Sequence, residues 1–282
     1  AVPARTLEPE RPGDRNDMVD REHHEAFERD GYFVVDDAID PDLIEPLRAA
    51  AVRIKAKVRA GEVDVYTQWA EPGEPFNILG MLSPDFDEPV FSEYLLCGPL
   101  LDAVIAQIGS ELRWEWLSLF TNPYHANFRL GWHRDLGGVA QDLPEAEELE
   151  NLHQPREECR WELALVDDTA LRLVPGSQYR HRTGPETEAI MNNLDVELPG
   201  QVVLELKAGQ TFFWNGKIIH ASQARKDRER LTLTGAYCRY DPEEKPQKVN
   251  GKIRWMLEDR VRDYLPEEMH LYYDRWRAVQ LP

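Results

Sequence analysis

The chain has 282 residues, of which 42% are hydrophobic and 10% aromatic, so it can bury a sizeable core and is not expected to be disordered. The formal net charge of −19 at pH 7 repels phosphate groups, which argues against a nucleic-acid partner and, more weakly, against a CoA-linked substrate. No apolar run reaches the roughly 18 residues of a membrane span, so we expect no membrane partner.

The N-terminal part of the chain is predicted to be mainly helical, after a poorly ordered leader over residues 1–20. Asp20 is positioned to cap a helix that starts at Arg21, and Gly31 can end that helix in the left-handed conformation. Apolar residues then recur at helical spacing in two further stretches. The elements expected before residue 110 are helices over 21–30, 42–59 and 95–108, and one strand over 32–35.

After residue 110 the pattern changes to short β-prone runs separated by Gly and Pro. Because these runs do not alternate with helices, a doubly wound parallel sheet is disfavoured. We expect an antiparallel sandwich or barrel with its core over about 111–240, within a single domain that spans 21–282. The predicted strands cover 114–120, 128–135, 161–166, 171–174, 202–206, 211–214 and 231–237.

Two segments interrupt or follow the β region. The acidic stretch 141–158 is expected to be partly helical, and it forms either a lid over the end of the preceding strand or a solvated surface insertion. The C-terminal stretch 252–280 mixes aromatic and charged residues and predicts helices packed on the barrel.

Cysteine usage indicates the compartment. Cys97, Cys159 and Cys238 are sparse and lack CxxC spacing, which favours neither a disulfide framework nor a zinc site. The first 20 residues lack the apolar core of a secretory signal. We therefore expect a cytoplasmic protein. As a separate expectation, the protein is a monomer or homodimer.

Two histidines and one aspartate give the strongest functional signal. His133 and Asp135 lie two residues apart on a predicted strand, so both side chains can enter one barrel interior before Gly137-Gly138 ends the strand. His220 follows a predicted strand, turn and second strand, and a barrel can bring it to the same place. Two imidazoles and one carboxylate are the donor set of an open-sided ferrous iron site. Alone, the His-x-Asp pair is a weak signal, since most histidines are surface or core residues.

A predicted strand with one polar face follows ten residues after the second histidine. Alternation places Arg230, Thr232 and Thr234 on one face and Leu231 and Leu233 on the other. Such a strand can be a water-exposed edge. The functional interpretation is a barrel strand whose guanidinium pairs with a carboxylate of a cosubstrate. Arg228 is in phase with Arg230 and is the alternative candidate.

Together these residues resemble the phytanoyl-CoA dioxygenase family of Fe(II)/2-oxoglutarate-dependent oxygenases. Two departures from the family pattern concern the turns: Gln178 stands where the family usually has His, and the turn over 168–171 is short and lacks glycine. Neither change touches a candidate ligand. The segments that carry the resemblance, in order, are 27–35, 132–135, 164–177, 209–222 and Arg230.

The resemblance implies a double-stranded β-helix, a jelly-roll or cupin-like barrel, with flanking N-terminal and C-terminal helices. It also implies a non-haem Fe(II)- and 2-oxoglutarate-dependent dioxygenase that uses dioxygen to hydroxylate a small organic substrate. Because related halogenases carry a small residue in place of the metal-binding carboxylate, Asp135 favours hydroxylation.

Site roles follow from the same resemblance. The implied iron ligands and catalytic centre are His133, Asp135 and His220. Arg230 is expected to bind the distal carboxylate of 2-oxoglutarate, with Ser222 as a hydrogen-bonding helper. Trp161 is expected to wall the cosubstrate pocket.

Two other hypotheses stay open. One is a cupin-like metalloenzyme that binds a metal but does not use 2-oxoglutarate. The other is a non-catalytic jelly-roll module that binds sugars on Tyr66 and Trp69. These two aromatic residues, with Asn77 and Phe120, are also candidates for a substrate-pocket wall.

Overall fold

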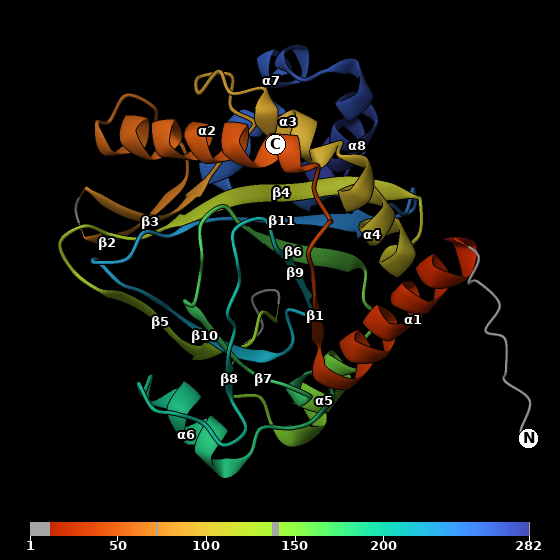
Figure 1. The fold of residues 1–282 in the computed structure, drawn as a ribbon, viewed down its shortest axis with the longest axis vertical. Coiled ribbons are helices and arrows are strands. Elements are labelled where there is room, and N and C mark those ends of the chain that lie inside the picture. The colour runs from red at the N-terminus through yellow and green to blue at the C-terminus, as the bar shows by residue number, and fades with distance from the viewer. Residues whose placement is uncertain (1–11, 72, 137–140, 282) are drawn as a thin grey trace, which may run out of the picture.

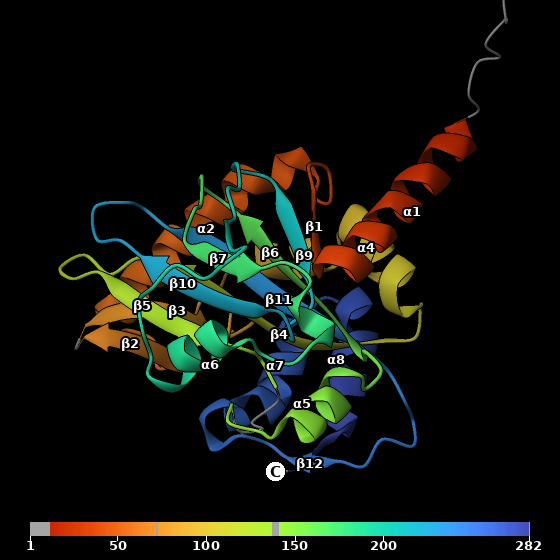
Figure 2. The same ribbon diagram turned by 90° about the horizontal axis from the view of Figure 1, so that it is seen from below.

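The computed structural model describes residues 12–71, 73–136 and 141–281 (Figure 1). Two antiparallel sheets face each other, and helices cover the outer side of the larger sheet (Figures 1 and 2). The described helices are α1 (Pro12–Asp30), α2 (Pro41–Arg59), α3 (Val90–Leu95), α4 (Gly98–Ile108), α5 (Glu145–Leu152), α6 (Gly184–Met191), α7 (Asp259–Tyr264) and α8 (Glu267–Ala278), with 3-10 turns η1 (Ser177–Tyr179) and η2 (Gly251–Leu257).

The strands are β1 (Tyr32–Val35), β2 (Thr67–Glu71), β3 (Glu74–Leu79), β4 (Leu112–Thr121), β5 (Phe128–His133), β6 (Glu158–Ala164), β7 (Leu171–Val174), β8 (Val202–Val203), β9 (Thr211–Trp214), β10 (Ile219–Ala224), β11 (Leu231–Arg239), β12 (Gln247–Lys248) and β13 (Gln280–Leu281). The larger sheet has the order β1-β9-β6-β11-β4-β3-β2, and the smaller has the order β5-β10-β7-β8. This arrangement confirms the predicted fold class of antiparallel β structure with flanking helices.

The main core lies between the larger sheet and the helices α2, α4 and α8 that pack on it (Figure 1). Alternate residues of β6 and β11 point into this core, so the other residues of the same strands face the smaller sheet. Helix α6 packs against β5 on the outer side of the smaller sheet (Figure 2). The space between the two sheets is therefore where polar side chains of both can meet.

Several predicted boundaries are wrong. The first helix begins at Pro12, so residues 12–20 of the expected leader are helical and Asp20 is not its cap. Proline is favoured in the first turn of a helix because an N–H at that position would have no helical partner. The Pro-, Arg- and Asp-rich composition of residues 1–20 instead favoured the prediction of a poorly ordered segment. Gly31 does end the helix, with φ +87°. The predicted helix over 95–108 is divided between α3 and α4.

The hairpin formed by β2 and β3 was not predicted. It extends the larger sheet beyond β4, with Asn77 paired to Phe120. Its polar residues, such as Gln68, break the alternation that marks a half-buried strand. This hairpin matters for function because it supplies one wall of the cavity described below.

The described helices include none long and apolar enough to cross a membrane. All three cysteines are buried free thiols. Gly137-Gly138, predicted to end the strand that carries the first histidine, lies outside the described residues, and β5 itself ends at His133.

Candidate active site

Neighbouring strands of the smaller sheet bring the two histidines together. His133 is the last residue of β5, and His220 on β10 is its direct cross-strand partner. The β10 register shifts between His220 and Ser222, which marks a local irregularity next to the second histidine. Asp135 lies two residues beyond β5, where its backbone N–H donates to the carbonyl of Gly216 at 2.8 Å.

The three side chains converge on one point. His133, Asp135 and His220 each offer a ligand atom, and these atoms lie within 4.8 Å of one another. The Nδ1 atom of His133 donates to the Gly131 carbonyl at 2.7 Å, and that of His220 donates to the Ile218 carbonyl at 3.0 Å. Because a carbonyl can only accept, both imidazoles are left with Nε2 as the free ligand atom, as is usual for metal-binding histidines.

The electrostatics of the site suit a divalent cation. Burial lowers the pKa of His220 to about 4, so this imidazole is neutral at neutral pH. Burial alone would raise the pKa of Asp135. The positive charges of His220, which is protonated at the acidic pH where this carboxyl titrates, and of Arg160 outweigh burial and hold that pKa below its usual range. A neutral imidazole and an ionised carboxylate are the forms that a metal requires.

Arg160 supports the aspartate and was not predicted. It lies on β6 of the larger sheet, and its guanidinium forms an ion pair with the Asp135 carboxylate. Its Nε atom also pairs with Glu158 at 2.6 Å, which fixes the direction of the side chain. The two opposed sheets are thus joined at the proposed ligand.

A cavity of about 350 Å³ opens beside these residues, between the two sheets. We call it the metal-side cavity. It reaches from the three candidate ligands to Arg230, and the unpredicted hairpin supplies part of its wall. The wall includes Gln68 and Asn77 of this hairpin, together with Trp116, Ser118, Phe120 and Leu130.

Arg230 is buried and held in place. Its Nε atom donates to Asp168 Oδ2 at 2.9 Å, and its Nη1 atom donates to Ser222 Oγ at 3.0 Å. The guanidinium also lies over the ring of Phe120, 4.8 Å from its centroid. Thr232 and the backbone N–H of Ala170 donate to the same aspartate. The predicted partnership of Arg230 and Ser222 is thus present in the structure.

Glu162 is a second unpredicted residue of the cavity. Its Oε2 atom lies 4.0 Å from Nη2 of Arg230. Burial raises the pKa of Glu162 to about 7, although the charge of Arg230 opposes this shift. An acid in this position lies beside the proposed carboxylate-binding arginine.

The prediction for Trp161 is wrong. Arg160 and Glu162 face the cavity, so Trp161 between them faces the helices. It is fully buried in the main core, where its Nε1 atom donates to the hydroxyl of Tyr94 at 2.8 Å. The polar residues on both sides of Trp161 in the sequence could have indicated that they, and not the tryptophan, face the cavity.

The other candidate wall residues divide between two places. Asn77 and Phe120 line the metal-side cavity, as predicted. Tyr66 and Trp69 instead line a separate groove with Trp255. Arg228, the alternative to Arg230, does not line the metal-side cavity but a third pocket.

Most residues of the acidic stretch 141–158 are exposed, as expected for a solvated surface insertion. Two residues of its helix α5, Glu148 and Leu152, are nevertheless buried, so the helix is anchored to the rest of the fold. None of its described residues lines the metal-side cavity, so it does not form a lid over it. Instead, Glu148 forms a buried ion pair with Arg134, the residue between His133 and Asp135.

The sequence matches the family profile described as Phytanoyl-CoA dioxygenase (PhyH) over residues 27–230. The chain belongs to the phytanoyl-CoA dioxygenase (PhyH) family. The matched segment contains all three candidate ligands and ends at Arg230, which confirms the predicted family. No curated protein matches the chain.

Solved structures share this PhyH fold at low sequence identity. AviO1 from Streptomyces viridochromogenes Tue57 is 19% identical, with a TM-score of 0.57 over 79% of this chain and 95% of that one. EctD from S. alaskensis, solved with 2-oxoglutarate and 5-hydroxyectoine, is 20% identical, with a TM-score of 0.59 over 78% and 76%. The epimerase SnoN, solved with Fe3+, alpha ketoglutarate and nogalamycin RO, is 18% identical, with a TM-score of 0.55 over 79% and 85%.

Proposed function

We propose that this PhyH-family protein is an Fe(II)- and 2-oxoglutarate-dependent dioxygenase that hydroxylates a small organic substrate. One observation carries the proposal: His133, Asp135 and His220 meet within 4.8 Å at one end of a cavity that also holds Arg230. Three protein ligands leave coordination positions open for a cosubstrate and dioxygen. The solved complexes of EctD with 2-oxoglutarate and of SnoN with Fe3+ and alpha ketoglutarate support the same pair of cofactors.

Each side chain has a role that its contacts support. His133, Asp135 and His220 would hold the iron, and Arg160 would fix the carboxylate of Asp135. Arg230 would bind the distal carboxylate of 2-oxoglutarate, since Asp168 holds its Nε atom and Nη2 makes no hydrogen bond to the described residues. Ser222 would orient Nη1. When bound, iron and 2-oxoglutarate supply the oxidation of a C–H bond by dioxygen.

The size of the cavity supports a small substrate. Its volume of about 350 Å³ lies at the lower end of typical ligand pockets and must hold cosubstrate and substrate together. Amide, hydroxyl and aromatic side chains from β2, β3 and β4 form the wall available to the substrate. We further propose that residues 21–282 work as one domain and that the buried free thiols belong to a protein of a reducing, cytoplasmic compartment.

The test is succinate release from 2-oxoglutarate in air with added ferrous iron, with a matched Asp135→Ala sample. We expect the wild-type protein to release succinate and the variant to release none. A panel of small substrates analysed by mass spectrometry would then show the gain of one oxygen atom. Iron binding without any effect of 2-oxoglutarate would instead identify the cupin-like alternative.

A further inference from the structure

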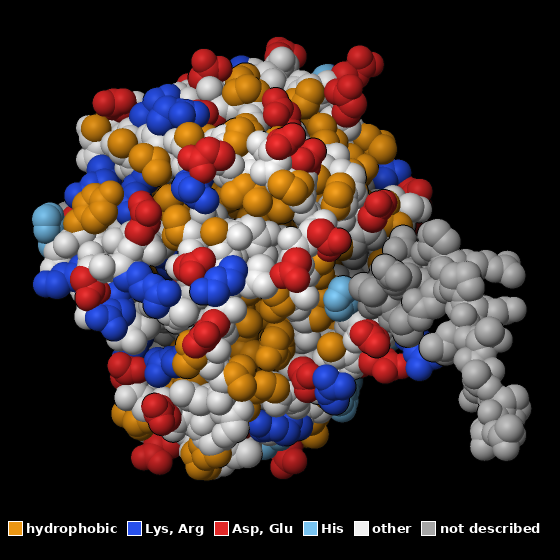
Figure 3. Space-filling view, in the orientation of Figure 1, with side chains coloured by type: hydrophobic (Ala, Val, Ile, Leu, Met, Phe, Trp, Pro, Cys, Tyr) orange, Lys and Arg blue, Asp and Glu red, His pale blue; other side chains and the backbone are white. Residues whose placement is uncertain are grey.

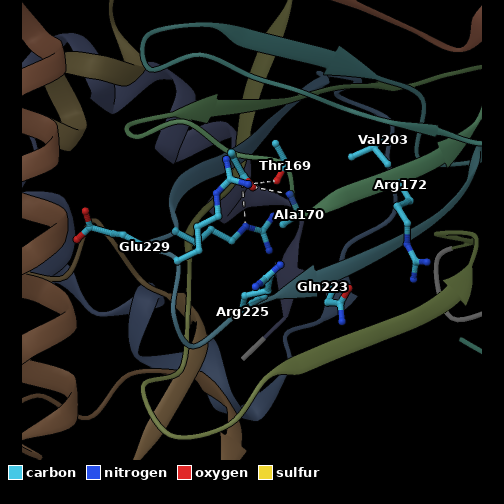
Figure 4. Close-up of a pocket in the computed structure, with 11 residues that line it drawn as sticks. Thr169, Ala170, Arg172, Val203, Gln223, Arg225 and Glu229 are labelled. Carbon is cyan, nitrogen blue, oxygen red and sulfur yellow. Dashed lines mark hydrogen bonds and ion pairs between the residues drawn. The ribbon is translucent and has the colours of Figure 1, made fainter.

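A separate cavity, of about 210 Å³, also has Arg230 in its wall. Figure 4 shows the residues that line it. Arg230 is the one lining residue that it shares with the metal-side cavity, and none of the three proposed ligands reaches it. The turn after β6, strand β7, the end of β10 and the β10–β11 loop form its walls. The side chains that matter are Thr169, Arg172, Gln223, Arg225, Arg228 and Arg230. We call this cavity the outer pocket.

The outer pocket is basic although the chain is acidic. Four of its lining residues are arginines, whereas the whole chain has 33 basic and 52 acidic residues. Lys and Arg side chains gather at the left of the face in Figure 3, on the side where the β10–β11 loop lies in Figure 1. Two acids line the pocket, but Asp168 is already bonded to Arg230, and Glu229 is directed away from the arginines (Figure 4).

The guanidinium groups keep donor capacity. Arg228 donates to the hydroxyl of Thr169 and has no carboxylate within 4.0 Å among the described residues. Arg172 is the least available of them, because it pairs with Asp195 at 2.9 Å and its guanidinium lies over the ring of Trp132. Arg225 pairs with the exposed Asp227 at 2.9 Å. An exposed pair such as that of Arg225 with Asp227 is worth about 0–1 kcal/mol, so it does not compete strongly with a bound anion.

We propose that the outer pocket binds a small oxyanion, the phosphate or carboxylate group of a small molecule. The planar fork of arginine matches such oxygens with two parallel hydrogen bonds. Arg228 supplies the charge without a carboxylate partner. Arg225 lies across from Thr169 and Ala170, and Gln223 adds an amide donor (Figure 4). The site is distinct from the proposed iron centre and does not depend on the proposed function.

Calorimetric titration of the metal-free protein with inorganic phosphate, at constant ionic strength, tests the proposal. We expect saturable binding of one phosphate per chain, weakened at least about tenfold by Arg228→Gln, which corresponds to one lost charged contact. Arg260→Gln is the control, because it removes the same charge from an exposed arginine outside the outer pocket, which pairs with Asp85. It should leave the phosphate affinity unchanged.

A parallel titration with succinate separates the two sources of the oxyanion. Phosphate binding that Arg228→Gln weakens assigns the pocket to a phosphate group. Succinate binding that Arg228→Gln weakens, without any phosphate binding, assigns it to a carboxylate. No saturable binding of either anion, or binding that Arg228→Gln and a second exposed variant, Arg225→Gln, both leave unchanged, would overturn the proposal. Equal unfolding temperatures of wild type and variants exclude a loss of structure as the cause.

Discussion

Arg134 and Glu148 form an ion pair, 3.2 Å from Nε to Oε1, in which both side chains are fully buried. Arg134 stands between His133 and Asp135, and its Nη1 atom donates to the carbonyl of Ser177 at 2.7 Å. The pair joins the β5 end, which carries two of the three candidate ligands, to α5 and η1. His181 and Arg182 contact the same glutamate. Its loss would leave two buried guanidinium groups, those of Arg134 and Arg182, without this carboxylate.

Glu148→Ala is therefore expected to lower the free energy of unfolding by about 3–5 kcal/mol, the usual result of removing one partner from a buried ion pair. Glu147→Ala is the control on the same helix, because Glu147 is exposed and should change stability by less than about 0.5 kcal/mol. Urea unfolding of the metal-free protein measures both. Equal stabilities of the two variants would show that the pair does not anchor the β5 end.

Arg160→Gln should weaken iron binding about 10- to 100-fold, which is typical for loss of a residue that orients a metal ligand. The reason is that Asp135 would lose the ion pair that fixes its carboxylate. Arg160→Lys should recover part of the affinity, and Arg239→Gln, at an exposed site on β11, should leave it unchanged. Anaerobic Fe(II) titration gives the three affinities, and unchanged affinity in Arg160→Gln would refute the positioning role.

Arg230→Ala should raise the KM for 2-oxoglutarate at least about 30-fold, because a buried hydrogen-bonded charge pair is worth about 2–5 kcal/mol. Ser222→Ala removes one hydrogen bond to the same guanidinium and should raise it only about 2- to 10-fold. Succinate release at varied 2-oxoglutarate concentration gives both values. A lower kcat with an unchanged KM in Arg230→Ala would place the cosubstrate elsewhere in the cavity.

The buried acid Glu162 predicts a pH dependence of stability. Burial raises its pKa from the ordinary 4.5 to about 7, so between these values the folded chain holds a proton that the unfolded chain has lost. This contribution is fully present below about pH 4.5 and is lost as the pH rises through about 7. Metal-free wild type should lose about 3 kcal/mol across this range relative to Glu162→Gln. Parallel stability curves of the two proteins would show that folding does not raise the pKa of Glu162.

The sequence predicted the strands in which polar and apolar residues alternate strongly, and the candidate iron ligands that lie in recognisable motifs. His133, Asp135 and Arg230 stand on runs whose polar and apolar faces are distinct. The pattern could not choose which face of β6 points at the site, so Trp161 was assigned to the cavity in place of Arg160. Period-2 alternation has two phases, and the choice depends on which side the helices cover.

Long-range contacts explain the rest of what the sequence could not show. The pairing of Arg134 with Glu148 joins segments through tertiary packing, and no spacing rule marks it. The hairpin of β2 and β3 presents Gln68 and Asn77 to the cavity beside Leu79, so its inner face is mixed and lacks the usual signature of a half-buried strand. Functional sites are where such local rules are most often broken.

The most direct test of the proposed iron centre is the visible absorption spectrum of the anaerobic protein with Fe(II) as 2-oxoglutarate is added. Wild type should develop a charge-transfer band that saturates at one 2-oxoglutarate per chain, and Asp135→Ala should develop none, while Asp142→Ala, at an exposed neighbouring position, should match wild type. A wild-type protein without the band, or an equal band in Asp135→Ala, would contradict the assignment of His133, Asp135 and His220 as the iron site.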